Sequence, residues 1–308
     1  MTQGIGVRYN EQGVRLLSVI RSEKSLKITG LAAGPPEETL EFFLKSKITI
    51  PGNTSITIGL KPGDFISSSM MCKEEMTGKE MEDHLRWEIE KKIISDPSDY
   101  AFDFFITDTT GYVFAGRKDI IEEETSLFSD KRSSLAHIFT DVETVALYNG
   151  SEGAGEVGMD TVMLISVEAE GISSLVIDRG ALVALESFPI QEEDLRFVLP
   201  GLDREGLNHI NTATIQRLAG YIEQTVKRLT SYGDYKDKPT LKRFVLSGGG
   251  AYCGNLAKVV SKMTGIPVTI SNPLKPRLTE VPESQAELVR MSAAFTSCFG
   301  LALRALED

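Results

Sequence analysis

The sequence predicts an α/β protein built as two lobes. Its 308 residues are 41% hydrophobic, which is enough to bury two cores of ordinary domain size. Short strand-like stretches rich in Val, Ile and Leu open the chain, at Ile5–Tyr9, Val14–Ile20 and Leu26–Leu31. A second triple of the same kind follows at Thr161–Val167, Ser173–Ile177 and Leu182–Phe188, which indicates an internally duplicated architecture.

The stretch between the two triples has mixed character. Thr77 and Glu80 have the spacing of a capping box, and the helix that follows places Met81, Leu85, Ile89 and Ile93 on one face. The charged residues on its other face are typical of a solvated helix surface. Further strands are expected at Thr57–Leu60, Phe65–Ser67, Tyr100–Thr107, Tyr112–Ala115 and His137–Thr140, and helices at Lys118–Phe128 and Asp141–Asn149.

Ser151–Gly155 is polar and rich in glycine, so it is expected to be the linker between lobes that span residues 1–154 and 155–308. In the second lobe, apolar residues spaced by three or four positions predict a long helix over Thr212–Ser231. The strand Phe244–Leu246, a glycine loop at residues 247–251 and the helix Asn255–Met263 come next. A strand at Val268–Ile270 and a closing helix or helix pair over Ser284–Arg304 complete the chain.

Charge and composition exclude several function classes. The net charge is −11 and there is no stripe of Lys and Arg, which argues against nucleic acid as a partner. No run approaches the roughly 18 apolar residues of a membrane span, and the N-terminus lacks a signal-peptide pattern, so a cytoplasmic location is expected. The cysteines and histidines are scattered along the sequence, which predicts reduced thiols and no metal site. They are Cys72, Cys253, Cys298, His84, His137 and His209.

The glycine loop Gly248–Gly249–Gly250 lies between a predicted strand and a predicted helix. In this layout backbone N–H groups approach a nucleotide closely, and glycine tolerates the backbone geometry required. Neither standard phosphate motif is complete, because Asn255 replaces the P-loop lysine and Cys253 replaces the third glycine of the dinucleotide motif. Taken alone, the loop fits a nucleotide site and a simple glycine-rich turn equally well.

Four ordered stretches resemble the PilM family of type IV pilus assembly proteins, a branch of the actin/Hsp70-like ATPases. Phe244-Val-Leu-Ser-Gly-Gly-Gly-Ala251 with Gly265-Ile-Pro-Val268 and Asn272-Pro273 is similar to the adenosine-binding segment of that superfamily. Leu85–Ile93 with Asp96-Pro97 and Phe102-Asp103 resembles the inserted subdomain of PilM. The other two similar stretches are the helix Tyr221–Leu229 and the closing segment Gly300–Arg304.

This resemblance implies a duplicated, ribonuclease-H-like actin fold with a small α+β subdomain inserted at about residues 60–128. It also implies which residues would contact the adenosine side of a nucleotide: Gly248, Gly249, Gly250, Glu223 and Asn272. The phosphate side departs from the superfamily. In the superfamily, each of the two hairpins on the phosphate side carries an Asp-x-Gly pattern. In this sequence the first hairpin reads Arg8-Tyr9-Asn10 and the second reads Ser166-Val167-Glu168.

With both aspartates and both glycines missing, little remains to hold Mg²⁺ or to bring backbone donors to a phosphate. The carboxylates of Glu11, Glu168 and Glu170 would repel a polyphosphate, and Arg8 would offset this only in part by contacting a phosphate directly. We therefore expect no catalytic residues, no resident cofactor, no metal, and weak or absent binding of ATP. The fold is expected to persist as that of a pseudo-ATPase.

By resemblance, the chain is a cytoplasmic scaffold of a pilus or related secretion complex at the inner membrane. Its implied partner is the cytoplasmic N-terminal tail of a PilN-like membrane protein, held beside the inserted subdomain, together with other pilus assembly proteins. An extended peptide in such a groove binds through apolar pockets and exposed backbone. Two alternatives stay open: a working actin-like ATPase, and a sugar or acetate kinase with the same fold.

Overall fold

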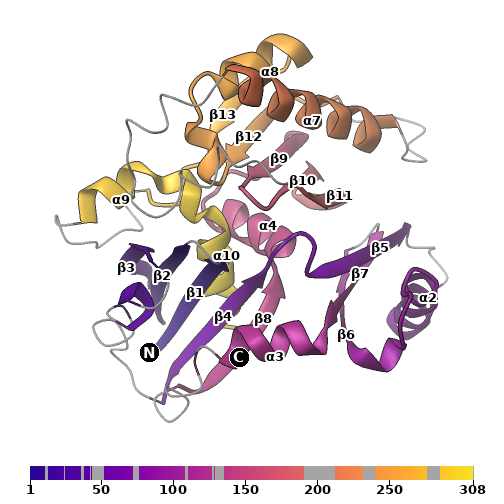
Figure 1. Ribbon diagram of the computed structural model, residues 1–308, viewed down its shortest axis with the longest axis vertical. Coiled ribbons are helices and arrows are strands. Elements are labelled where there is room, and N and C mark those ends of the chain that lie inside the picture. The colour runs from indigo at the N-terminus through magenta and orange to yellow at the C-terminus, as the bar shows by residue number, and fades with distance from the viewer. Residues whose placement is uncertain are drawn as a thin grey trace.

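The computed structural model describes residues 1–10, 13–23, 25–35, 38–41, 43, 52–71, 76–107, 110–126, 128, 135–190, 212–231, 240–275 and 285–307. Two five-stranded sheets dominate this part of the chain (Figure 1). The first has the order β3-β2-β1-β4-β8, from β1 (Thr2–Asn10), β2 (Gly13–Ser22), β3 (Ser25–Gly34), β4 (Thr54–Leu60) and β8 (His137–Val142). The second has the order β11-β10-β9-β12-β13, from β9 (Val162–Val167), β10 (Gly171–Asp178), β11 (Ala181–Pro189), β12 (Arg243–Ser247) and β13 (Val268–Ile270).

The two sheets share one topology. In each, the first three strands form an antiparallel meander, the fourth strand pairs in parallel with the first, and the fifth pairs in parallel with the fourth. The predicted internal duplication is therefore present in the structure. Its consequence is that the β1–β2 hairpin of the first sheet and the β9–β10 hairpin of the second occupy equivalent places.

A third, smaller sheet is inserted between β4 and β8. It has the antiparallel order β5-β7-β6, from β5 (Phe65–Met71), β6 (Tyr100–Ile106) and β7 (Thr110–Arg117). Helix α2 (Gly78–Glu90) covers one face, and the predicted capping box of Thr77 and Glu80 is confirmed at its start. On the other face Tyr112 and Phe114 pack into the core beneath the second large sheet. The turn η1 (Pro97–Asp99) precedes β6, and α3 (Lys118–Ser126) leads back to the first sheet.

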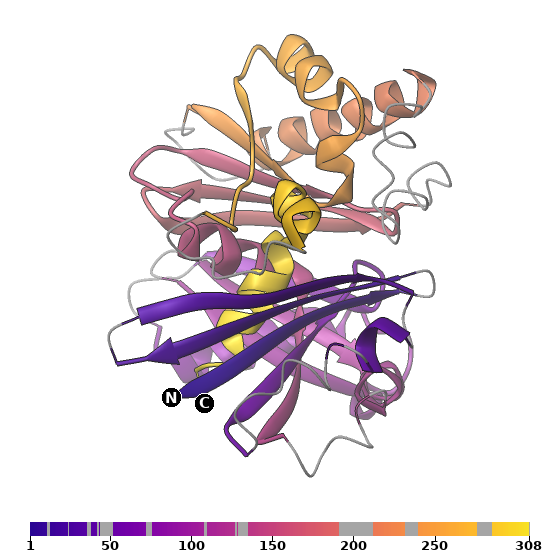
Figure 2. The same cartoon turned by 90° about the vertical axis from the view of Figure 1, so that its left-hand side faces the viewer.

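Helices α4 (Glu143–Gly153) and α10 (Thr296–Arg304) lie between the two large sheets (Figures 1 and 2). Residues of α10 pack on Leu17, Val19 and Leu31 of the first sheet, and residues of α4 pack on Leu164 and Leu175 of the second. Helices α7 (Thr212–Ser231) and α8 (Leu256–Thr264) cover the outer face of the second sheet. The remaining elements are η3 (Gly249–Tyr252), α9 (Ala286–Arg290) and η6 (Ser292–Phe295).

Two expectations from the sequence need correction. The predicted linker at Ser151–Gly155 is instead largely the last turn of α4, which runs to Gly153. Its glycines allow close packing, because a β-carbon on Gly153 would lie 2.7 Å from a methyl group of Leu303. The predicted closing helix is divided into α9, η6 and α10, and the last of these packs on the first sheet. The lobe boundaries at residues 154 and 155 stay a prediction.

No helix in the described part of the chain has both the length and the apolar character that a membrane crossing requires. No three His, Cys, Asp or Glu side chains in those residues are grouped so that they could hold a metal ion.

Candidate functional site

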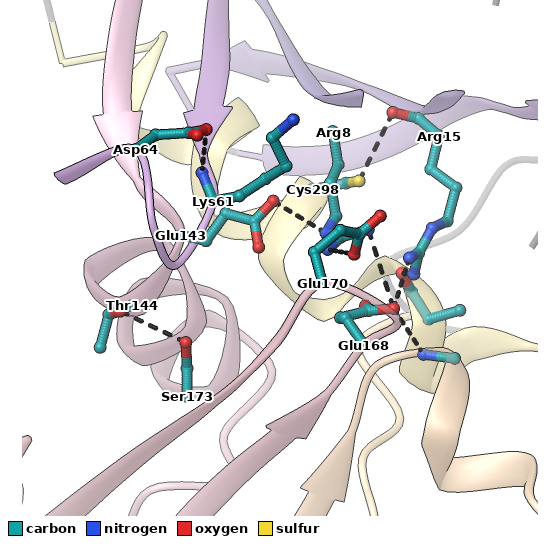
Figure 3. Close-up of polar contacts among 12 residues, drawn as sticks. Arg8, Arg15, Lys61, Asp64, Glu143, Thr144, Glu168, Glu170, Ser173 and Cys298 are labelled. Carbon is teal, nitrogen blue, oxygen red and sulfur yellow. Dashed lines mark hydrogen bonds and ion pairs between the residues drawn. The ribbon is translucent and has the colours of Figure 1, made fainter. Parts of the chain in front are cut away.

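The candidate site lies where the β1–β2 hairpin faces the β9–β10 hairpin. Arg8 of β1 and Arg15 of β2 are directly opposite each other in the antiparallel pairing of the first hairpin. Like charges in such a cross-strand pair are destabilising unless they are compensated. The compensation comes from the second hairpin, whose turn between Val167 and Gly171 carries Glu168 and Glu170 (Figure 3).

Five side chains form an ion-pair cluster, defined here as Arg8, Arg15, Glu143, Glu168 and Glu170, of which all but the partly exposed Glu170 are buried. Arg8 Nε lies 2.8 Å from Glu143 Oε1, and Arg8 Nη2 donates to Glu170 Oε2 at 2.9 Å. Arg15 Nη2 donates to Glu168 Oε2 at 2.7 Å, and Arg15 Nη1 donates to the carbonyl of Ala294. Both guanidinium groups are less than 5% exposed. The cluster therefore joins the first hairpin to α4, to the second hairpin and to the segment before α10.

Glu168 also contacts the glycine loop. The backbone N–H of Gly249 donates to Glu168 Oε2 at 3.1 Å, so the oxygen that pairs with Arg15 also accepts from the loop. Gly248 has φ of +80°, and a β-carbon there would lie 2.4 Å from the carbonyl oxygen of Val167 and 3.0 Å from Glu168 Oε1. Glycine at position 248 is thus required both by the backbone conformation and by the close approach of the second hairpin.

Burial within the ion-pair cluster shifts the pKa of Glu143. Two guanidinium groups face three carboxylates, so one negative charge would be in excess if all five were ionised. Burial raises the pKa of Glu143 to about 7, against the opposing effect of Arg8 and with a further rise from Glu168 and Glu170. Burial also acts to raise the pKa of Glu170, but the charge and hydrogen bond of Arg8 outweigh it and lower that pKa overall.

Asn272, expected to contact the adenosine side of a nucleotide, is held by internal contacts. Its backbone N–H donates to Glu156 Oε1, and its side-chain Oδ1 accepts from Ser292 Oγ at 2.7 Å. The other carboxylate oxygen of Glu156 accepts from Ser271 Oγ at 2.8 Å. Glu156 thereby joins the segment after α4 to the segment after β13.

The other expected site residues fall in different places. Gly248, Gly249 and Gly250 are buried beside the second hairpin, where a β-carbon on Gly250 would meet the side chain of Val167. Ser166 is buried near Gly248. Glu223 lies on α7 and pairs with Lys227 at 2.9 Å. Asn10 ends β1 opposite Gly13, but its side chain lies outside the described part of the structure, as does all of Glu11.

The connection into the inserted sheet passes close to the ion-pair cluster. Asp64 Oδ2 accepts from the backbone N–H of Lys61 at 3.1 Å, and burial raises the pKa of Asp64. In the same turn Pro62 packs on the second hairpin, because a β-carbon on Gly171 would lie 2.7 Å from Pro62 Cβ. The entry to the inserted sheet is thus in direct contact with the hairpin that carries Glu168 and Glu170 (Figure 3).

The donors that could contact a phosphate are engaged by carboxylates of the protein itself. The Gly249 N–H group and the Arg15 guanidinium bind the carboxylate of Glu168, and Arg8 is held by Glu143 and Glu170. A phosphate placed there would meet three carboxylates. The arrangement supplies electrostatic cross-links between segments that are far apart in the sequence.

Sequence reasoning missed Arg15, Glu143 and Glu156. Arg15 had a usable signal, since it is a charged residue within an apolar strand, and the antiparallel pairing sets it opposite Arg8. Glu143 and Glu156 come from a distant part of the chain, and their roles depend on how α4 sits between the sheets. No local pattern marks either of them.

Comparison with solved structures reveals a similarity over the whole chain. A PilM-PilN type IV pilus biogenesis complex contains a chain that is 19% identical, with 99% of both chains covered and a TM-score of 0.74. A Bacteroides thetaiotaomicron protein with an actin-like ATPase fold and unknown function is 10% identical, covering 94% of this chain and 96% of that one, with a TM-score of 0.50. The chain has the actin-like fold.

A diol dehydratase-reactivating factor in its nucleotide-free form is also similar, at 7% identity, full coverage of both chains and a TM-score of 0.55. No protein-family model matches the sequence, and no curated protein matches it. The predicted two-lobed actin-like architecture and the predicted structural resemblance to PilM are confirmed. At these identities the similarity establishes the fold, and function has to be argued from the site.

Proposed function

We propose that this protein is a cytoplasmic scaffold in the inner-membrane complex of a type IV pilus or a related secretion system. In this role it binds the cytoplasmic N-terminal tail of a PilN-like membrane protein and does not hydrolyse ATP. The observation that carries the proposal is the similarity to the PilM-PilN complex over 99% of both chains. The actin-like protein of Bacteroides thetaiotaomicron and the diol dehydratase-reactivating factor have lower TM-scores, of 0.50 and 0.55.

The ion-pair cluster supports the absence of ATP turnover. Phosphate-binding groups act only when they are free to contact the ligand, and here Gly249 N–H and Arg15 are engaged by Glu168. Opening the site for a nucleotide would leave buried charges without partners, which costs about 3–5 kcal/mol for a single broken pair. A nucleotide would have to supply that energy before it gained any affinity.

The inserted subdomain supports the role in partner binding. Eight large hydrophobic side chains are exposed among the described residues, and four of them fall between residues 60 and 128: Met71, Trp87, Ile94 and Ile106. Met71 pairs with Thr110 and Ile106 pairs with Gly111, so both lie at the same end of the small sheet. Exposed apolar residues gathered in one subdomain are typical of an interaction surface. Both outer strands of this sheet also offer an edge to an extended peptide.

The test is calorimetric titration of the purified protein with a synthetic peptide that has the cytoplasmic N-terminal sequence of the PilN-like protein from the same genome. We expect micromolar binding that is unchanged by millimolar ATP and Mg²⁺, and no binding heat from ATP and Mg²⁺ alone. A scrambled peptide serves as the control. No binding of the native peptide to the folded protein would overturn the scaffold proposal.

Variants locate the surface. Replacing both Met71 and Ile106 by Asp should weaken peptide binding about tenfold or more, since a charge would enter an apolar contact. Met159→Asp is the matched control, because Met159 is exposed but precedes the second sheet. Magnesium-dependent binding of ATP by the wild-type protein would favour the ATPase alternative, and ATP turnover with a small acceptor would favour the kinase alternative.

A further inference from the structure

One carboxylate oxygen gathers donors from both lobes. Glu168 Oε2 accepts from Arg15 Nη2 at 2.7 Å and from Gly249 N–H at 3.1 Å, and Arg8 Nη1 lies 3.7 Å away. Arg8 and Arg15 belong to the first sheet, whereas Gly249 belongs to the loop after β12 of the second. Glu168 itself is only 5% exposed, so these donors act on it in a setting from which water is largely excluded.

The donors around Glu168 are those that bind phosphate-type anions in other proteins. Backbone N–H groups donate to bound anions, and guanidinium groups bind phosphate and carboxylate oxygens with the same geometry. Gly248 has φ of +80° and no space for a β-carbon on the side of Glu168. The three donors therefore make a cradle, defined here as Arg8, Arg15 and Gly249 N–H, whose anion is a side chain of the same protein.

We propose that Glu168 is a tethered anionic ligand, which fills a phosphate-type anion site between the lobes and holds them together without nucleotide. Each contact of Glu168 with an arginine joins the second hairpin to the first. Glu170 adds a parallel contact with Arg8 at 2.9 Å. In this arrangement side chains of the protein itself hold the two lobes together. The inference rests on the cradle geometry and not on the pilus role, so loss of peptide binding and failure of the anion test are separate results.

The experiment compares Glu168→Ala with Glu168→Gln, using inorganic phosphate as the probe. Glu168→Ala removes the carboxylate from the cradle. We therefore expect the midpoint of thermal unfolding of this variant to rise with phosphate concentration. Phosphate should also restore slow hydrogen exchange of the Gly249 amide. Glu168→Gln keeps an oxygen in the cradle and excludes phosphate by its size. Wild-type protein and Glu186→Ala, which removes a distant ion pair with Arg228 in the second lobe, should show no response to phosphate.

A second substitution, Arg15→Met, added to Glu168→Ala should abolish the phosphate response, because it removes the donor that makes the shortest contact in the cradle. A folded Glu168→Ala protein whose midpoint and Gly249 exchange ignore phosphate would overturn the proposal. A Glu168→Ala protein that folds only when phosphate is present would support it.

If Glu168→Ala does not fold in either condition, Glu168→Gln decides the question. A neutral amide oxygen is a weaker acceptor than a carboxylate, so exchange of the Gly249 amide should be about tenfold faster than in the wild type. Equal exchange rates in the wild type and in Glu168→Gln would show that the carboxylate does not act as the ligand of the loop, and the proposal would fail.

Discussion

Gly150 of α4 and Gly300 of α10 pack against each other's helix backbone at the centre of the molecule. A β-carbon on Gly300 would lie 1.8 Å from the carbonyl oxygen of Ala146, and a β-carbon on Gly150 would lie 2.1 Å from that of Thr296. The two helices therefore approach more closely than any other residue type would allow at these positions. Since α4 packs on the second sheet and α10 on the first, this crossing fixes the spacing of the lobes that the ion-pair cluster connects.

Gly300→Ala should destabilise the protein by about 2 kcal/mol or more, because the added methyl group overlaps backbone atoms that cannot rotate away. Gly220→Ala is the matched control. Gly220 lies inside α7, and beyond its own helix turn no atom of the described residues lies within 4 Å of an added β-carbon. This change should therefore stabilise by about 0.5–1 kcal/mol through helix propensity. Urea unfolding of both variants measures the difference. Equal stability of Gly300→Ala and the wild type would mean that the helices are farther apart than described.

The elements predicted from hydrophobic patterns agree well with the structure, and the failures have a common physical cause. Strands such as β9 and helices such as α7 follow from local periodicity, which needs no knowledge of the partner surface. Gly153 contributed to the expectation of a linker at Ser151–Gly155, because glycine weakens an isolated helix. Here glycine is instead favoured by the close crossing with α10, and that requirement appears only once the two helices meet.

The candidate site was predictable only in part, for a similar reason. The altered hairpin sequences at Arg8 and Glu168 are visible in the chain, and they indicated that a phosphate would be poorly held. The sequence did not indicate that Glu168 itself would take up the donors of the glycine loop. That contact joins residues 81 positions apart, and the contact of Arg15 with Glu168 joins residues 153 positions apart. Such pairs depend on the packing of the lobes.

Thr77→Ala should destabilise α2 by about 1 kcal/mol, because Thr77 Oγ1 caps the backbone N–H of Glu80. Hydrogen exchange in the first turn of α2 should become faster, while exchange in the two large sheets stays unchanged. Glu80→Gln is the control, since a glutamine side chain can still accept from the backbone N–H of Thr77 as Glu80 does at 2.8 Å. A larger effect of Glu80→Gln than of Thr77→Ala would contradict this account of the cap.

Cys253 and Cys298 should resist thiol reagents in the folded protein. Burial raises the pKa of both thiols to about 12, so at pH 8 the reactive thiolate is about a thousandfold scarcer than for an ordinary cysteine. In a Cys72→Ser variant, a disulfide reagent should modify neither thiol in native buffer and both in guanidinium chloride. Cys298 Sγ lies 3.6 Å from the carbonyl oxygen of Arg15, so fast labelling of Cys298 would reveal opening beside the ion-pair cluster.

Glu143→Gln should change how stability depends on pH. Because burial raises the pKa of Glu143 in the folded protein from 4.5 to about 7, the folded state binds this proton more tightly than the unfolded state. The contribution of Glu143 to stability is therefore fully present below pH 4.5 and is lost as the pH rises to 7.

Glutamine carries no such penalty, so the free energy of unfolding of the variant should match that of the wild type near pH 4.5 and exceed it by about 1–3 kcal/mol at pH 8. Urea unfolding at the two pH values tests this, and Glu170, whose pKa is lowered, contributes a trend of the opposite sign in both proteins. An ionised Glu143 that is stabilised by Arg8 would reverse the result, with Glu143→Gln less stable than the wild type at pH 8.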